Sequence, residues 1–165
     1  MSFFDILFPK KEEHSNIRLY APMEGQAVPL SEVPDITFSE KLLGDGIAII
    51  PASGKVYAPC DGTVDNAFHT GHAITMTTKS GAELLIHIGL ETVSLEGNPF
   101  KVHVKNGDKV KKGQLLIEAD LDAIKAVGLN TITPMLVCNI DDYSDMAVVT
   151  GKTVTTDDMV VEIVK

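Results

Sequence analysis

Histidine is the side chain of this sequence best suited to chemistry at neutral pH, and the chain has five: His14, His69, His72, His87 and His103. Two of them fall in the short apolar or alternating segments His72–Thr78 and Ala82–Gly89. The turn signal Lys79-Ser80-Gly81 lies between these segments, and the pattern predicts a β-hairpin closed by the two-residue loop Ser80-Gly81.

That hairpin register brings His72 and His87 together. It places His87 opposite Ile74, and His72 shares a face with Ile74 because side chains alternate along a strand. His72 then becomes the diagonal neighbour of His87, with about 7–8 Å between their backbones. The same face is expected to carry Ile74, Met76 and Leu85, so the two imidazoles would emerge from an apolar surface.

Paired imidazoles in apolar surroundings avoid double protonation, so one ring can stay neutral with a nucleophilic nitrogen while the other donates a hydrogen bond. The alternative is structural, because buried histidines are often satisfied by backbone carbonyls. We favour the chemical interpretation because the two rings share one face. His69 and His103 are expected at the surface.

Three kinds of chemistry fit such a pair. A zinc peptidase needs a third ligand, as in His-x-x-x-Asp with His-x-His, but Ala73 follows His69 by four and His87-Ile88-Gly89 lacks the second histidine. A biotinyl or lipoyl carrier needs a lysine in a Met-Lys-Met or Asp-Lys-Ala context, which Lys79 lacks. Phosphoryl transfer needs only a neutral imidazole and nearby donors such as His72 and Thr70, with no cofactor and no metal.

The rest of the chain predicts an all-β fold. From Leu19 onward, short apolar or alternating runs are broken by Gly, Pro, Asn and Asp at intervals typical of strands. One short helix is predicted over Asp120–Val127, with Asp120 as N-cap, and another over Pro34–Leu43, ended by Gly44. We therefore expect an antiparallel β-sandwich or partly closed barrel with one or two short helices.

An internal repeat narrows the fold. The segment from Tyr20 to Val28, YAPMEGQAV, is echoed by YAPCDGTV from Tyr57 to Val64, and each reads as strand, turn and strand. Downstream, the segment Val104–Leu116 contains Gly107-Asp108, then Val110, then Gly113-Gln114. This order predicts two tight turns on either side of a short strand. This pattern resembles the barrel-sandwich hybrid, or duplicated hybrid motif, an architecture that hosts several chemistries.

Composition limits the partners. The chain has 165 residues, with 14 basic and 23 acidic side chains and a net charge of −9, which argues against nucleic acid. We divide it into a tail, residues 1–18, and one domain, residues 19–165. The tail could form a short amphipathic helix whose residues 1–9 make at most a weak contact with a membrane surface. With no signal peptide and no long apolar span, a cytoplasmic location is expected.

From about Tyr20 to Lys165 the chain resembles the glucose-type enzyme IIA family of the bacterial phosphoenolpyruvate-dependent sugar phosphotransferase system. The segments that carry the resemblance include Ala21–Gly25, Val33–Asp35, Leu43–Ile49, Ala58–Thr63, Thr70–Ala73 and Glu83–Val93. The last is the most specific. Departures are Glu91 where the family commonly has Asp, Thr37 where it has a branched apolar residue, and Asn98-Pro99-Phe100 in place of a Gly-rich approach.

The resemblance implies a phosphotransferase component. His87 would accept a phosphoryl group from the phosphohistidine of the carrier HPr and pass it to a cysteine of a sugar-specific IIB domain. By position, His72 would be the second active-site histidine and Thr70 the hydroxyl that supports it, while the Gly89 carbonyl would fix the tautomer of His87.

Partner contacts are assigned to Asp35, Phe38, Ile74, Leu85 and Glu91. The resemblance also leaves room for regulatory protein targets, because phosphorylation would change the charge of the docking surface. A non-catalytic regulatory or binding module on the same fold is the main alternative function.

Overall fold

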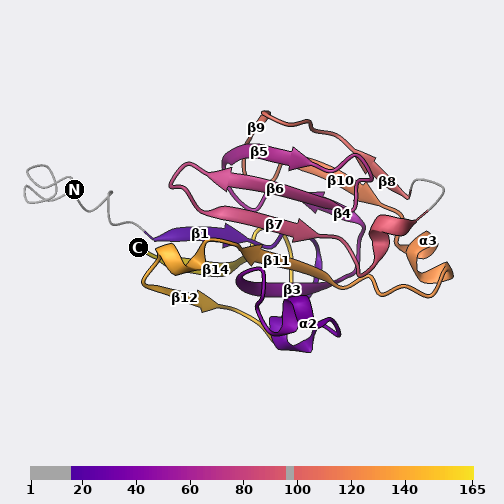
Figure 1. Cartoon of the computed structure of the whole chain (residues 1–165), viewed down its shortest axis with the longest axis horizontal. Helices are drawn as coiled ribbons and strands as arrows, with labels where there is room; N and C mark the ends of the chain where they lie inside the picture. The colour runs from indigo at the N-terminus through magenta and orange to yellow at the C-terminus, as the bar shows by residue number, and fades with distance from the viewer. Residues whose placement is uncertain (1–15, 96–98) are drawn as a thin grey trace, which may run out of the picture.

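A computed structural model gives the fold of residues 16–95 and 99–165 (Figure 1). Fourteen strands are present in these ranges: β1 (Ile17–Tyr20), β2 (Gly25–Pro29), β3 (Asp45–Pro51), β4 (Lys55–Tyr57), β5 (Gly62–Ala67), β6 (Ala73–Thr78), β7 (Glu83–His87), β8 (Phe100–Val102), β9 (Lys109–Val110), β10 (Leu115–Ala119), β11 (Thr133–Val137), β12 (Asp145–Val148), β13 (Lys152–Val154) and β14 (Met159–Val164). The helices are η2 (Leu30–Glu32), α2 (Ile36–Ser39), η3 (Thr92–Ser94), α3 (Leu121–Ala126) and η4 (Ile140–Asp142).

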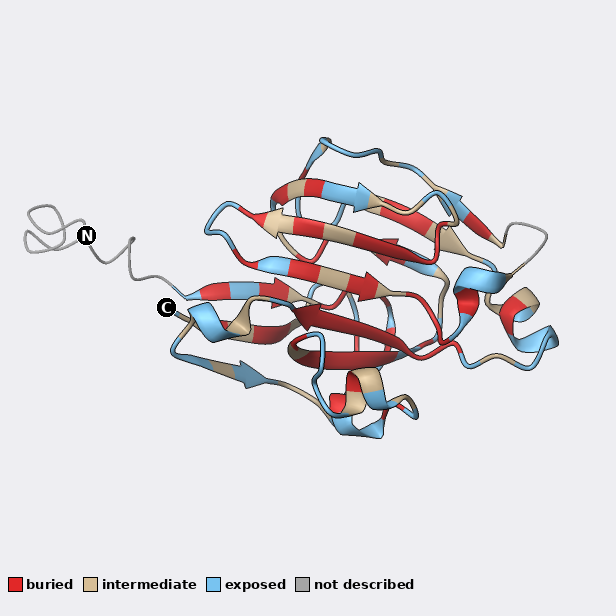
Figure 2. Cartoon of the chain, in the orientation of Figure 1, coloured by how far each residue is buried: buried red, intermediate tan, exposed pale blue. Residues whose placement is uncertain are grey.

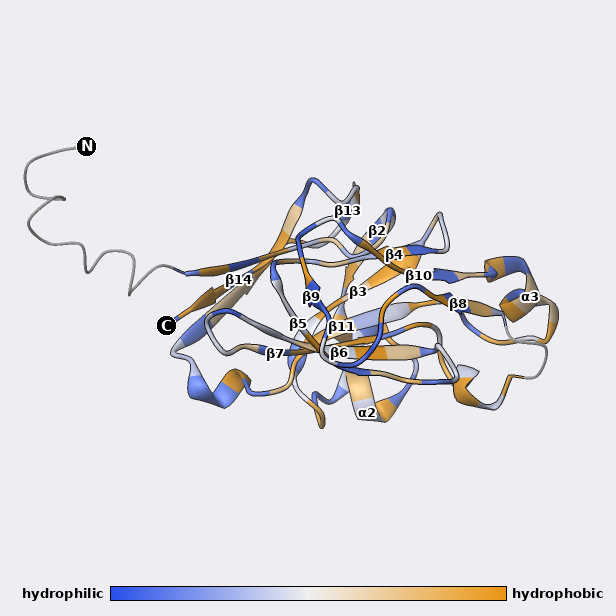
Figure 3. Ribbon diagram, turned by 90° about the horizontal axis from the view of Figure 1, so that it is seen from above, coloured by the Kyte–Doolittle hydropathy of each residue, from blue (hydrophilic) through white to orange (hydrophobic). Residues whose placement is uncertain are grey.

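The predicted β-sandwich is confirmed. An eight-stranded sheet has the order β13-β2-β3-β11-β7-β6-β5-β9, and two three-stranded sheets have the orders β1-β14-β12 and β4-β10-β8. All pairings among the described strands are antiparallel. Seen edge-on, α2 projects from the side of the large sheet that faces away from β4 and β10 (Figure 3). The large sheet ends at β13 and β9, so it does not close into a barrel.

The first strand begins earlier than the domain boundary set from the sequence, since β1 starts at Ile17 and pairs with β14. The predicted helix and membrane contact of residues 1–9 lie outside the described residues. None of the described helices is long and apolar enough to cross a membrane.

The two copies of the repeat form a pair with matching hydrogen bonds. The Tyr20 amide donates to the Pro59 carbonyl at 2.9 Å, and the equivalent Tyr57 amide donates to the Pro22 carbonyl at 2.8 Å. Each copy is a strand, a turn and a strand, as the sequence predicts. The exchange of equivalent bonds links the two copies, which is the arrangement expected of a duplicated motif.

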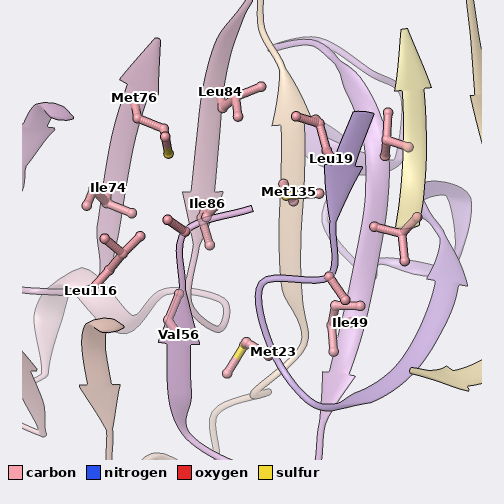
Figure 4. Packing of buried hydrophobic residues seen from close by; sticks show 14 of the residues in the cluster. Leu19, Met23, Ile49, Val56, Ile74, Met76, Leu84, Ile86, Leu116 and Met135 are labelled. Carbon is pink, nitrogen blue, oxygen red and sulfur yellow. The ribbon is translucent and has the colours of Figure 1, made fainter. Parts of the chain in front are cut away.

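Apolar side chains form two clusters, one on each face of the large sheet. The main core lies between the sheets and includes Leu19, Ile49, Ile74, Ile86 and Leu116 (Figure 4). The outer cluster comprises Val28, Leu30, Val33, Phe38, Ala48, Leu90, Ile132 and Leu136. Because η2 and α2 contribute residues to the outer cluster, β3 and β11 are buried on both faces and are red along most of their length in Figure 2.

Both predicted helices are present, and the cap residues explain where they begin. The Asp120 carboxylate accepts a bond from the Ala123 amide at the start of α3. The Asp35 carboxylate caps α2 through the Thr37 amide at 2.9 Å. This helix is a single turn, shorter than the predicted Pro34–Leu43.

The predicted register of the β6–β7 hairpin is wrong by one residue. The Thr78 amide donates to the Ala82 carbonyl, so the loop contains three residues, and Gly81 adopts the left-handed conformation at φ +94° that such a loop requires. His87 therefore lies opposite Ala73 rather than Ile74. A one-residue shift moves every side chain to the other face.

The shift removes Ile74 and Met76 from the face of His87. Both are fully buried in the main core (Figure 4). The assignment of Ile74 to partner contacts is therefore wrong. Leu85 is still on the face of His87, half-buried against the outer cluster.

Candidate active site

His72 and His87 meet at one end of the β6–β7 hairpin, with ring centroids 5.1 Å apart and planes inclined by 78°. The prediction that they meet is confirmed, although the register that led to it is wrong. His87 is the last residue of β7, whereas His72 joins the turn ending at Gly71 to the first residue of β6. Strand alternation therefore does not fix the direction of the His72 side chain.

The protonation of His87 is set by a backbone carbonyl. Its Nδ1 lies 2.7 Å from the Gly89 oxygen, which only accepts hydrogen bonds, so Nδ1 carries the proton. In the neutral ring the lone pair is then on Nε2. Gly89 has a φ of +72°, and an added Cβ would lie 2.8 Å from the Asn130 carbonyl oxygen, so the carbonyl takes this position only on glycine.

The second histidine has a different partner. The Thr70 hydroxyl and Nδ1 of His72 share a hydrogen bond of 2.5 Å. A hydroxyl can donate or accept, so this bond permits either tautomer of His72. When the hydroxyl donates, Nε2 of His72 carries the ring proton and can donate a hydrogen bond to a neighbouring anion.

Burial keeps both rings neutral at pH 7. Burial, together with the smaller effect of the nearby imidazoles of His87 and His69, lowers the pKa of His72 from the usual 6.5 to about 4. Burial also lowers the pKa of His87, although the bond to Gly89 and the Asp35 carboxylate act in the opposite direction. A neutral imidazole has an unshared electron pair, so the site presents a nucleophilic nitrogen rather than a cation.

Two phenylalanine rings pack against the two histidine rings. Phe38 lies 5.2 Å from His87, and Phe68 lies edge-on to His72 at 5.3 Å, both between ring centroids. Phe38 is only 4% exposed, so it shapes the pocket more than it offers surface to a partner. Phe68 was not among the residues predicted for the site from the sequence. The signal was an aromatic residue four positions before His72, in the turn that orients that ring.

The predicted acidic residues lie together beside the site. Asp35 and Glu91 line one cavity of about 270 Å³, and Glu91 has a left-handed backbone at φ +59°. Around them are exposed apolar side chains that sequence analysis did not assign to partners: Ile36 is 65% exposed and Val93 is 54% exposed. The rim of the site is thus apolar and acidic, as a surface for a basic, partly apolar protein would be.

The other two histidines among the described residues lie outside the pair. His69 is exposed in the turn before Thr70, and His103, also exposed, bonds through Nε2 to Glu118 at 2.7 Å. Within the described residues, no group of three or more His, Cys, Asp or Glu side chains could hold a metal ion.

The fold has a close counterpart among solved structures. Glucose permease IIA from Mycoplasma capricolum matches with a TM-score of 0.81 and 36% identity, over 98% of this chain and 99% of that one. The protein is therefore a β-sandwich of the IIA class. In addition, residues 17–143 match the family model described as phosphoenolpyruvate-dependent sugar phosphotransferase system, EIIA 1.

Relatives agree with the family model. The glucose-specific EIIA component of Oceanobacillus iheyensis is 44% identical over 144 residues, 87% of each chain, and that of Haemophilus influenzae is 37% identical over 166 residues, 100% of each. The glucose-specific EIICBA component of Staphylococcus saprophyticus is 45% identical over 93% of this chain, which spans only 22% of that protein. The chain belongs to the EIIA type 1 family of the phosphoenolpyruvate-dependent sugar phosphotransferase system.

Proposed function

We propose that His87 is the residue that carries the phosphoryl group, receiving it from a phosphohistidine of HPr and passing it to a cysteine of a IIB domain. The observation that supports this most is the bond between Nδ1 of His87 and the Gly89 carbonyl, 2.7 Å long. It holds the neutral ring in the tautomer whose Nε2 is free to attack phosphorus.

In the first transfer, Nε2 of His87 attacks phosphorus in line with the bond to the donor nitrogen. The new P–N bond forms as the old one breaks, and the donor imidazole leaves with its electron pair. Nδ1 keeps its proton throughout, because that proton stays bonded to the Gly89 carbonyl. In the second transfer a cysteine thiolate of IIB attacks, and Nε2 recovers its lone pair.

His72 and Thr70 have a supporting role in this proposal. With the Thr70 hydroxyl donating to Nδ1, the His72 Nε2–H can bond to a phosphoryl oxygen on the neighbouring ring 5.1 Å away. This bond would be strongest as negative charge builds in the transition state. The aromatic walls Phe38 and Phe68 would exclude water while a partner covers the site.

Both partners are proposed to dock on the rim around His87. Exposed Ile36 and Val93 would enter the apolar centre of each interface, and Asp35 and Glu91 would attract basic side chains of HPr. The EIICBA name of the Staphylococcus saprophyticus relative supports a IIB partner, and the glucose-specific names favour glucose as the transported sugar. We also propose a cytoplasmic location, as the sequence predicts.

The test is incubation with phosphoenolpyruvate, enzyme I and HPr, followed by mass spectrometry for an acid-labile gain of one phosphoryl group. We expect His87→Ala to abolish the gain and His103→Gln, a change at an exposed histidine, to leave it intact. A gain in His87→Ala, or phosphate mapped to His69, would refute the assignment. No gain in the unmodified protein would favour the regulatory module instead.

Docking can be tested separately by titrating HPr. Ile36→Asp introduces a charge at the proposed centre of the interface, and Val148→Asp introduces the same charge at a side chain of β12 that is 43% exposed. We expect the first to weaken HPr binding by about tenfold or more and the second to have little effect. Equal effects would show that HPr does not dock around α2.

A further inference from the structure

A second candidate binding site lies at the other end of the β6–β7 hairpin from the histidines. A cavity of about 400 Å³ is lined by Asp61, Gly62, Thr63, Thr77, Thr78, Lys79, Lys109, Val110 and Lys111. This volume falls within the range of small-molecule pockets. The strands that build it, β9, β5 and β6, lie side by side at the upper edge of the large sheet in Figure 1.

The strand register explains why lysines and hydroxyls converge there. Thr63 lies opposite Thr77 on one side and opposite Lys109 on the other, so these three side chains share one face. Two residues beyond Thr77 and Lys109, the same alternation of side chains brings Lys79 and Lys111 to that face. Asp61, two residues before Thr63, lies beside them. The result is a hydroxyl-bearing floor with ammonium groups on both sides.

Those ammonium groups have no acidic partner within the described residues. The chain carries 23 acidic side chains against 14 basic ones, yet none lies within 4 Å of the Lys79, Lys109 or Lys111 ammonium in the part of the chain that the structure describes. Five of the basic residues fall in residues 101–112, where β9 lies. This edge is therefore positive on an otherwise acidic protein.

The acidic groups near the cavity are already hydrogen-bonded. Asp61 lines it, but its Oδ1 accepts a bond from the Lys112 amide at 2.8 Å. Asp65 accepts from the Thr77 hydroxyl at 2.6 Å. The Thr63 hydroxyl and three ammonium groups remain as donors that a ligand can use.

We propose that this cavity binds a phosphate-bearing small molecule. Lysine ammonium groups and hydroxyls are donors suited to phosphate oxygens, and their position on both sides of the floor fits a ligand with two anionic groups. An anionic membrane surface is a poorer fit, because the surface is hollowed and its one large apolar lining residue, Val110, is only 3% exposed.

The test is titration of the ¹⁵N-labelled full chain with pyrophosphate, a hexose bisphosphate and, in a separate arm, vesicles containing anionic lipid. We expect saturable amide shifts at Thr63, Thr77 and Lys109 with one of the two small anions. Lys109→Ala/Lys111→Ala should weaken this binding by about tenfold or more, because charge-assisted bonds to phosphate are lost. Lys101→Ala/Lys105→Ala removes the same charge from exposed lysines outside the cavity and should change it by less than about twofold.

Three outcomes would overturn the proposal: no saturable shift at the lining residues, equal weakening in both double variants, or binding to vesicles but to neither small anion. Phosphorylation of His87 by HPr, measured on the same variants, reports folding. It also separates this proposal from the phosphocarrier role, since neither double variant alters the histidine site.

Discussion

His87 and His72 lie 5.1 Å apart between ring centroids, yet the second nitrogen of each ring has a different kind of partner. The partner of His87 is a backbone carbonyl held by a left-handed glycine, which allows one tautomer. The partner of His72 is the hydroxyl of Thr70, which allows both. The difference shows how one apolar pocket can hold one imidazole as a nucleophile and leave the other to serve as a hydrogen-bond donor.

Displacing the Gly89 carbonyl should have the largest effect on the rate of phosphorylation by HPr. Gly89→Ala would force a Cβ to within 2.8 Å of the Asn130 oxygen, so the turn must shift and the carbonyl must leave Nδ1. We expect phosphorylation by HPr to fall by about 100-fold or more, as misplaced reacting groups commonly cause. Quenched-flow measurement of phosphohistidine would give the rate.

Gly151→Ala is the matched control, because Gly151 has a similar φ of +79° but nothing within 4 Å of an added Cβ. It imposes the same backbone strain far from the histidines and should leave the rate nearly unchanged. A similar loss in both variants would mean that general destabilisation, and not the Gly89 carbonyl, explains the result.

A substitution at His72 should distinguish the role of this ring from that of His87. His72→Gln replaces the imidazole N–H with the N–H of a flexible amide but leaves His87 and Gly89 in place, so we expect acceptance to persist while transfer to IIB slows by about 100-fold. Single-turnover transfer from phosphorylated protein to IIB measures this step. His69→Gln, at the exposed neighbouring histidine, should transfer normally. If His72→Gln fails to accept phosphate at all, the two rings share the nucleophilic role and the comparison breaks down.

The pH dependence of stability should also depend on His72. Its pKa is lowered to about 4 in the folded protein, so between pH 6.5 and 4 the unfolded chain binds a proton that the folded chain excludes. Stability is therefore fully present above pH 6.5 and is lost as the pH falls, by about 2 kcal/mol between pH 7 and pH 5 from this group. Urea unfolding at both pH values would measure it.

In His72→Gln this contribution is absent, and the difference from the unmodified protein cancels the other titrating groups. We expect the variant to lose about 2 kcal/mol less between pH 7 and pH 5. Equal losses in the two proteins would show that His72 titrates normally and that the apolar walls do not keep it neutral.

The smallest expected effect on the transfer rate comes from removing the Thr70 hydroxyl. Thr70→Val removes the bond to Nδ1 of His72 with little change in shape, and the loss of one hydrogen bond predicts about a fivefold slower transfer to IIB. Thr70→Ser, which keeps the hydroxyl, should restore most of the rate. If valine and serine behave alike, the tautomer of His72 is not set by residue 70.

Sequence patterns predicted the sandwich and both short helices because strand periodicity, cap residues and the internal repeat are local signals. The meeting of His72 and His87 was also predicted, but through a wrong register. The loop length depended on whether Gly81 adopts a left-handed backbone, which Lys79-Ser80-Gly81 does not specify. That error placed Ile74 on the wrong face.

The rim of the site was harder to predict. Phe68 orients toward His72 only because of the turn ending at Gly71, and Ile36 is exposed because α2 buries Phe38 instead. Which member of a short apolar run faces solvent depends on how the helix seats on the outer cluster. A single sequence carries no local signal for that choice.

The most direct test of the difference between the two rings is ¹⁵N–¹H NMR of the histidine side chains at pH 7, before and after phosphorylation by HPr. The structure predicts that neutral His87 carries its proton on Nδ1, that Nε2 is unprotonated, and that phosphorylation changes the Nε2 resonance of this ring alone. A proton on Nε2 of His87, or a phosphoryl group on Nδ1 or on His72, would contradict the account.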